Sequence, residues 1–253
     1  MSGPRPRPLV IGHRGDSASC PENTRASFAS ALAGGADGLE LDLRPTRDGA
    51  VVVCHDATLA RFDGPRRPLA RQTLRELQSR DVGSWFEARF HAERLVSLDA
   101  LLTEFAARTL LLLELKAAAG IGARARNRRL CHATVEAITR HGVGERVLIL
   151  CFSSRLLAQV AALAPQLRLV RNCAHRPRHL ARWLARQPRL HGVDFDRRVL
   201  NRRLVAECRA QGLQVFTWSC NDPAAYAALQ DLGLDGILSD RPAWLHGQVH
   251  GHG

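Results

Sequence analysis

The sequence predicts an α/β fold, a TIM (β/α)8 barrel with a small insertion after the second strand. The chain has 253 residues, close to the roughly 250 that such a barrel needs. Hydrophobic residues make up 45% of it, which suits one large core. Short apolar runs alternate with amphipathic segments, and this alternation indicates a parallel sheet that eight units can close into a barrel. We therefore expect residues 1–253 to form a single barrel domain.

The first two predicted strands carry polar residues at or near their ends. The apolar run Leu9–Gly12 predicts a buried strand just before a histidine. A helix should follow, with Asn23 or Thr24 as its N-cap and the pair Gly34–Gly35 as its stop. Gly38–Leu43, in which leucines alternate with two carboxylates, predicts the second strand.

Residues 57–96 interrupt the regular alternation. A short strand at Val51–Cys54 comes just before them. The segment itself is polar, and a short helix is expected near Thr73–Ser79. Its apolar anchors are Trp85, Phe86 and Phe90. We interpret the segment as an insertion over the barrel rim rather than as a separate domain.

The alternation then returns and continues nearly to the end of the chain. Strands are expected at Leu110–Leu115, Val147–Phe152, Leu167–Val170, Val193–Phe195, Gln214–Trp218 and Gly236–Leu238. Helices are expected at Leu98–Ala107, Asn127–Arg140, Ser154–Leu163, Pro177–Arg186, Leu200–Gln211 and Asp222–Leu232. The tail after Pro242 is short for a closing helix, so we interpret its histidines, His246, His250 and His252, as part of a frayed end rather than a metal site.

The net charge of +12 raises the question of a nucleic-acid partner. Of the 36 Lys and Arg residues, only Lys116 is lysine, which indicates a compositional bias toward arginine. Aromatic residues do not interleave with the arginine clusters, so no nucleic-acid partner is expected. An anionic small-molecule substrate would gain from the positive field in any case.

The chain has no feature of a secreted or membrane-spanning protein. Its seven cysteines contain no C-x-x-C pair, and reduced thiols are expected. No run approaches the roughly 18 apolar residues of a membrane helix, and no signal-peptide core precedes the first strand. We predict a cytoplasmic protein without a transmembrane segment; the sequence gives no indication of its oligomeric state.

Carboxylates and histidines gather at the predicted strand ends. Glu40 and Asp42 are two residues apart in one strand, so their side chains share a face. His13 and His55 end two other apolar runs. An isolated pair of carboxylates could simply face solvent, but carboxylates together with histidines point to a metal and a proton-transfer pair. In a TIM barrel, these strand ends form the active site.

Four motifs occur in a fixed order along the first quarter of the chain. They are His13-Arg14-Gly15, Pro21-Glu22-Asn23-Thr24, Glu40-Leu41-Asp42, and His55-Asp56 followed by Leu59 and Arg61. Together they resemble the glycerophosphodiester phosphodiesterase family, and the resemblance extends through Glu114-Leu115-Lys116 and Trp218 to Ser239-Asp240. It implies a TIM barrel that hydrolyses glycerophosphodiesters to glycerol 3-phosphate and an alcohol with a divalent metal.

Each candidate residue has a role in this hypothesis. Glu40, Asp42 and Glu114 are hard oxygen donors that suit Mg²⁺ or Ca²⁺ better than zinc. His13 and His55, at the family's matching positions, form the proposed acid–base pair, because imidazole titrates near neutrality.

The candidate substrate-binding residues are Arg14, Lys116 and Trp218. Arg14 can contact the phosphate through its planar fork, and Lys116 should share the face of Glu114. Trp218 offers an apolar wall, with a place in the barrel core as the rival interpretation. For Glu22 and Asn23, the alternative is that they tie loops together.

Two other functions remain open at this stage. A lysophospholipase D-type phosphodiesterase would use the same fold, and a hydrophobic rim around Trp85, Phe86 and Phe90 would favour it. A more distant alternative is a basic nucleic-acid-binding module without turnover. The chain also has Trp218-Ser219-Cys220-Asn221 where the family would have Trp-Thr-Val-Asn, a departure that bears on the choice of substrate.

Overall fold

A computed structural model describes residues 7–62, 64 and 66–251, and these residues form one nine-stranded sheet. The strands are β1 (Leu9–His13), β2 (Gly38–Pro45), β3 (Val51–Val53), β4 (Leu110–Leu115), β5 (Val147–Cys151), β6 (Arg168–Cys173), β7 (Gly192–Asp196), β8 (Gln214–Trp218) and β9 (Gly236–Ser239). Parallel pairing runs in the order β1-β9-β8-β7-β6-β5-β4-β2, and β1 also pairs with β2. The sheet therefore closes on itself, and the predicted (β/α)8 barrel is confirmed.

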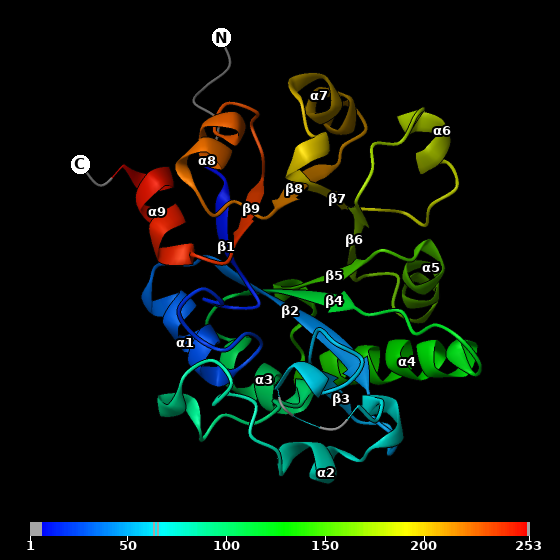
Figure 1. Cartoon of the computed structure of the whole chain (residues 1–253). Coiled ribbons are helices and arrows are strands. Elements are labelled where there is room, and N and C mark those ends of the chain that lie inside the picture. The colour runs from blue at the N-terminus through cyan, green and yellow to red at the C-terminus, as the bar shows by residue number, and fades with distance from the viewer. Residues whose placement is uncertain (1–6, 63, 65, 252–253) are drawn as a thin grey trace.

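Helices surround the barrel (Figure 1). They are α1 (Arg25–Ala33), α2 (Leu74–Gln78), α3 (Leu98–Phe105), α4 (Ala123–His141), α5 (Ser154–Leu163), α6 (Leu180–Leu184), α7 (Arg202–Ala210), α8 (Pro223–Leu229) and α9 (Pro242–His250). Thr24 caps α1 as predicted, because its hydroxyl accepts a hydrogen bond from the Ser27 amide. The α1 helix then ends at Ala33, just before Gly34. Two large apolar clusters fill the space between the strands and these helices.

A smaller apolar layer fills the inside of the barrel. Its buried members come from six strands and are Ile11, Leu112, Leu148, Leu150, Val170, Phe216 and Leu238. Because strand side chains alternate, the residue two positions further along faces inward as well. Glu114 follows Leu112 in this way, Asn172 follows Val170, and Trp218 follows Phe216. The inner surface therefore changes from apolar to polar toward the C-terminal ends of the strands.

The loop after β1 lies close against α1. A Cβ at Gly12 would come within 2.9 Å of the Ala31 Cβ, and one at Gly15 within 2.5 Å of the Ser27 hydroxyl. Gly15 also has a φ of +82°, a backbone conformation that favours glycine. These glycines allow the close contact that holds His13 at the end of its strand.

The segment 57–96 carries its own small core. Besides α2, which confirms the helix predicted near Thr73–Ser79, it contains the 3-10 turns η1 (Ala60–Phe62), η2 (Leu69–Arg71) and η3 (Ala88–Phe90). Its buried apolar residues pack with Val52 and Cys54, and β3 pairs with β2 in antiparallel fashion. The pairing of β3 with β2 attaches the segment to the barrel, which fits the interpretation of an insertion over the barrel rim.

The C-terminal tail departs from the sequence-based expectation. It forms α9, a helix that begins at Pro242, and the expectation of a frayed end was wrong. Leu245 and Val249, four residues apart on one face, are buried and anchor the helix beside β1. His246 and His250 stack on each other at 4.1 Å, while His252 lies outside the described residues. The helix predicted at Pro177–Arg186 is shorter in the structure, where it spans Leu180–Leu184.

Candidate active site

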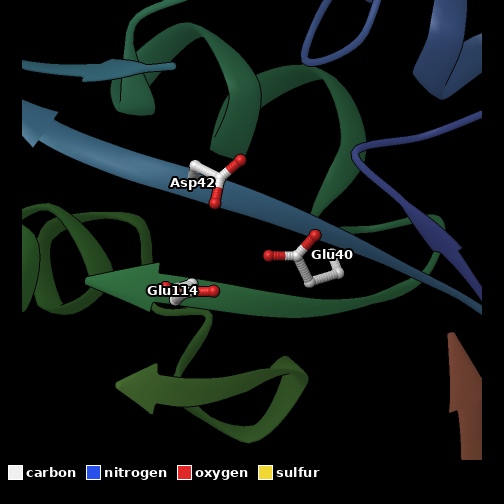
Figure 2. Close-up of side chains that lie close together, drawn as sticks. All are labelled: Glu40, Asp42 and Glu114. Carbon is white, nitrogen blue, oxygen red and sulfur yellow. The ribbon is translucent and has the colours of Figure 1, made fainter. Parts of the chain in front are cut away.

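Three carboxylates meet at the C-terminal end of the barrel. Glu40 and Asp42 come from β2 and Glu114 from the neighbouring β4, and Figure 2 shows their side chains turned toward one another. One oxygen of each lies within 4.8 Å of the others. Each residue is buried, with 1% of Glu40, 1% of Asp42 and 7% of Glu114 exposed. We call this group the carboxylate trio.

Burial and mutual repulsion oppose full ionisation of the trio. Burial, together with the charges of Asp42 and Glu114, raises the pKa of Glu40 well above its ordinary value. Burial also raises the pKa of Glu114, although Lys116 acts against this. Buried hard oxygens in such an arrangement fit a divalent cation, which would offset the repulsion that raises these pKa values. In the part of the chain that the structure describes, this is the one group of three or more potential ligands.

Lys116 supplies one of the compensating charges. Its ammonium lies 2.8 Å from Asp42 Oδ1 and 2.7 Å from Glu114 Oε1. Burial opposes ionisation of Asp42, but Lys116 and Arg14 outweigh it and lower the pKa of Asp42 to about 2. The sequence-based expectation that Lys116 shares the face of Glu114 agrees with this contact. Asp42 is therefore ionised and lies between two cations, Lys116 and Arg14.

Arg14 and the loop after β1 support the trio from one side. Arg14 Nε lies 3.3 Å from Asp42 Oδ2, and its Nη1 donates to Glu22. Asn23 donates a hydrogen bond of 2.8 Å to Asp42. Arg14 and Asn23 have φ values of 59° and 60°, uncommon for residues with a Cβ. Glu22 and Asn23 thus tie loops to the site, the alternative that their positions in the sequence had suggested.

His13 is held by the last barrel strand. Its Nδ1 lies 2.6 Å from Asp240 Oδ1, and its Nε2 lies 3.9 Å from Glu40 Oε2. Asn221 and Ser17 hydrogen-bond to Asp240 in turn. Burial opposes ionisation of Asp240, but its hydrogen bond to His13 helps to lower its pKa. An ionised Asp240 accepts from Nδ1–H, so the Nε2 of His13 is free to face the trio.

His55 is held by a second chain of contacts. Its Nδ1 lies 2.8 Å from Asp56 Oδ1, and Asp56 accepts a hydrogen bond of 2.8 Å from Arg61 Nε. Arg61 also pairs with Glu22 at 2.6 Å, which connects the insertion to the loop after β1. Burial lowers the pKa of His55. The imidazole is therefore neutral at neutral pH, with its Nε2 available as a proton acceptor.

A cavity of about 290 Å³ lies over the trio, and we call it the central cavity. Every candidate residue from the sequence lines it except Asp42, which is covered by its partners. The predicted residues in its lining are His13, Arg14, Glu40, His55, Glu114, Lys116 and Trp218. A larger cavity of about 610 Å³ lies beside it, between Arg44, Ala57 and Ala117, but it contains no member of the trio and neither histidine. The central cavity is therefore the candidate active site.

The structure adds lining residues that the motifs did not indicate. Phe152 packs edge-to-face on Trp218 at 6.0 Å and forms an apolar wall. Asn172 and Asp194 lie on the floor of the cavity. Both occupy inward positions, Asn172 near the end of β6 and Asp194 in the middle of β7; a count of two residues from Val170 and from Gly192 would have shown this. The cysteines, by contrast, are all buried and free, and burial raises the pKa of Cys54 to about 12.

Known proteins share both this sequence pattern and this fold. Residues 13–244 match the profile of the Glycerophosphoryl diester phosphodiesterase family. A glycerophosphodiester phosphodiesterase from Caldanaerobacter subterraneus subsp. tengcongensis is 32% identical over 241 residues, which cover 94% of this chain and 96% of the relative. A second, from Bacillus subtilis, is 26% identical over 251 residues, covering 95% of this chain and 86% of the relative.

A solved structure gives the same result. The phosphodiesterase of Oleispira antarctica, in complex with the product sn-glycerol-3-phosphate, superposes with a TM-score of 0.87 at 26% identity. The match covers 97% of this chain and 98% of that one. Among the described residues, no helix combines the length and apolar character needed to cross a membrane. The chain belongs to the glycerophosphoryl diester phosphodiesterase family and is an enzyme of phosphodiester hydrolysis.

Proposed function

We propose that this enzyme hydrolyses glycerophosphodiesters to glycerol 3-phosphate and an alcohol, with a divalent metal and two histidines. The observation that carries the proposal is the placement of His13 and His55 around the carboxylate trio in one cavity. Each histidine has its Nδ1 fixed by a separate carboxylate. The names of the relatives support the choice of glycerophosphodiesters as the substrate class.

The trio would hold Mg²⁺ or Ca²⁺ in this proposal. When bound there, the ion supplies Lewis-acid stabilisation of the charge that builds up on the phosphate oxygens. Lys116 and Arg14 hold Asp42 as an anion, which keeps it ready as a ligand. Arg14 also lines the central cavity, so that its guanidinium can contact the phosphate of the substrate.

The two histidines move the protons. Burial lowers the pKa of His55, which makes its neutral ring the base that takes a proton from the attacking water. His13, which must carry a proton on Nε2 to act as the acid, gives that proton to the leaving oxygen, while Asp240, 2.6 Å from Nδ1, keeps the ring in place. The proton taken up by His55 is released to solvent and His13 is reprotonated before the next turnover. Arg61 holds Asp56 and so fixes the orientation of His55. Fixed orientation matters because proton transfer requires hydrogen-bond contact in the transition state.

A substrate panel tests the proposed function. Glycerophosphocholine, glycerophosphoethanolamine and lysophosphatidylcholine would each be incubated with the purified enzyme, with Mg²⁺, with Ca²⁺ and with EDTA. We expect glycerol 3-phosphate from the first two substrates in the presence of metal. Release of choline from the lysolipid, without hydrolysis of the short diesters, would assign the enzyme to the lysophospholipase D type instead.

The structure gives the lysolipid alternative no specific support. Trp85, Phe86 and Phe90 pack on one another and on Phe62, each is half-buried, and none lines the central cavity. These three residues therefore add no apolar surface to the lining of the central cavity. Membership of an enzyme family likewise leaves the nucleic-acid-binding module without support. We retain the cytoplasmic location as a prediction.

A further inference from the structure

Two polar side chains on the floor of the central cavity have unsatisfied atoms. Asn172 on β6 and Asp194 on β7 are register partners in the sheet, and they are 2% and 1% exposed. Their Oδ1 atoms are buried, and neither accepts a hydrogen bond from any described residue. Asp194 also has no ion-pair partner among those residues, although the site is rich in cations. Buried acceptors are almost always satisfied in native proteins, so this pair needs an explanation.

A structural role does not explain the pair. An unpaired acceptor in a buried place destabilises a fold, whereas an apolar side chain of the same size would add packing. Burial raises the pKa of Asp194 well above its ordinary value, a further sign that the group is poorly solvated. Groups that cost stability in the free protein are retained where they serve function. A ligand with hydroxyl groups would satisfy both acceptors.

The position of the pair relates it to the substrate. In the order of the closed sheet, β6 and β7 lie on the opposite side of the barrel from β1 and β2 (Figure 1). Asn172 and Asp194 therefore face the carboxylate trio across the cavity. Leu150 and Leu238, which belong to the apolar layer inside the barrel, line the same cavity and mark its deep end. The indole Nε1 of Trp218 is a third buried polar atom there that has no hydrogen-bond partner among the described residues.

We propose that Asn172 and Asp194 form a subsite for the two hydroxyl groups of the substrate's glycerol. This inference rests on the proposed function. Neighbouring strands are about 4.8 Å apart, so acceptors on β6 and β7 can each reach one of two hydroxyls on adjacent carbons. With about 290 Å³, the cavity is at the small end of ligand pockets, which suits a three-carbon polyol and its phosphate. The alcohol group of the substrate would leave through the mouth.

Binding at this subsite can be measured by competitive inhibition, which does not depend on the identity of the nucleophile. The inhibition constants of sn-glycerol 3-phosphate and of n-propyl phosphate, which lacks both hydroxyls, would be determined against glycerophosphocholine hydrolysis. We expect the wild-type enzyme to bind the hydroxylated ligand at least about tenfold more tightly. In Asn172→Leu and Asp194→Leu, this ratio should fall by about fivefold or more, mainly through weaker binding of glycerol 3-phosphate. An unchanged ratio in both variants would overturn the assignment.

Thermal melting separates recognition from structural support. Because leucine removes an unsatisfied buried acceptor, both metal-free variants should melt at or above the wild-type temperature. A variant that melts lower and keeps the wild-type ratio would show that the residue is structural. Should a variant lose turnover, the same two ligands can be compared by their shift of the melting temperature. Failure of the wild-type enzyme to hydrolyse any diester would refute the proposed function, which is a different result from an unchanged ratio.

Asp196 on the same strand provides a matched control. It is also buried, at 3% exposed, but its carboxylate is paired with Arg198 and does not line the central cavity. Asp196→Asn should leave the ratio of the two inhibition constants unchanged. A separate comparison of glycerophosphocholine with glycerophosphoinositol tests whether the hydroxyls bound at the subsite belong to the glycerol or to the alcohol of the substrate. If the variants change only the preference for the alcohol, the subsite binds the alcohol and the assignment to glycerol is wrong.

Discussion

The only lysine of the chain can be tested by a substitution that keeps its charge. In a protein that otherwise uses arginine, Lys116 lies between Asp42 and Glu114 with 13% of its side chain exposed. An ammonium is a compact charge that fits between two carboxylates, whereas a guanidinium is broad and planar. We expect Lys116→Arg to lower kcat/KM by at least about tenfold while the fold survives.

The contact distances give the magnitude. At an effective dielectric constant of about 20, unit charges 2.8 Å apart attract by about 6 kcal/mol, and this falls to about 4 kcal/mol at roughly 4 Å. The charge centre of a guanidinium lies about that far from a carboxylate oxygen, so each contact loses up to about 2 kcal/mol. A larger head group would also displace Asp42 and Glu114 from their present positions. A loss of about 1.4 kcal/mol in transition-state stabilisation already corresponds to tenfold.

Steady-state kinetics with glycerophosphocholine, alongside a thermal melt, measures the effect. Arg203→Lys is the control, because Arg203 lies on the exposed side of α7, where it pairs with Glu207, and the exchange should change neither quantity. The reasoning is refuted if Lys116→Arg melts like the wild type and retains its kcat/KM. The single lysine would then be an accident of composition.

Three further predictions concern the metal and the histidines. EDTA should abolish activity and Mg²⁺ or Ca²⁺ should restore it, because three carboxylates converge; full turnover of chelated enzyme would exclude the metal assignment. His13→Ala and His55→Ala should each lower kcat by about 100-fold or more, and near-normal kcat in either variant would make that histidine structural. Because folding lowers the pKa of His55 below its ordinary 6.5, the unfolded state binds the proton more readily, so stability should fall as the pH drops below that value. Melts of wild type and His55→Gln between about pH 5 and 8 should run parallel above 6.5 and show a steeper loss of stability for the wild type below it. Curves that stay parallel over the whole range would contradict the lowered pKa.

The barrel and the convergence of the three carboxylates could be predicted because both follow from local sequence patterns. Alternating apolar runs fix the strands, and Glu40 and Asp42 share a face simply because they are two residues apart in one of them. The α9 helix was missed for a related reason. Its apolar residues Leu245 and Val249 are few, and only their packing beside β1, at the other end of the chain, makes the helix stable.

Contacts between distant parts of the chain could not be predicted in the same way. His13 and Asp240 are 227 residues apart, and a sequence shows them as two separate motifs rather than as one hydrogen bond. The connection from Arg61 through Asp56 to His55 likewise depends on how the chain folds after β3, which no local pattern indicates. Asn172 and Asp194 gave no motif at all, because what distinguishes them is the missing partner.

The charges in direct contact at the trio favour the proposed combination of a divalent ion and an anionic substrate. Glu40, Asp42 and Glu114 can carry three negative charges, against one positive charge each from Lys116 and Arg14. One negative charge is left over, and burial together with repulsion from Asp42 and Glu114 raises the pKa of Glu40. A divalent ion would change this excess into one positive charge, which equals the single negative charge of a phosphodiester. A monovalent ion would leave the site neutral, without a net attraction for the substrate, so the same balance predicts that Na⁺ or K⁺ cannot replace Mg²⁺ or Ca²⁺.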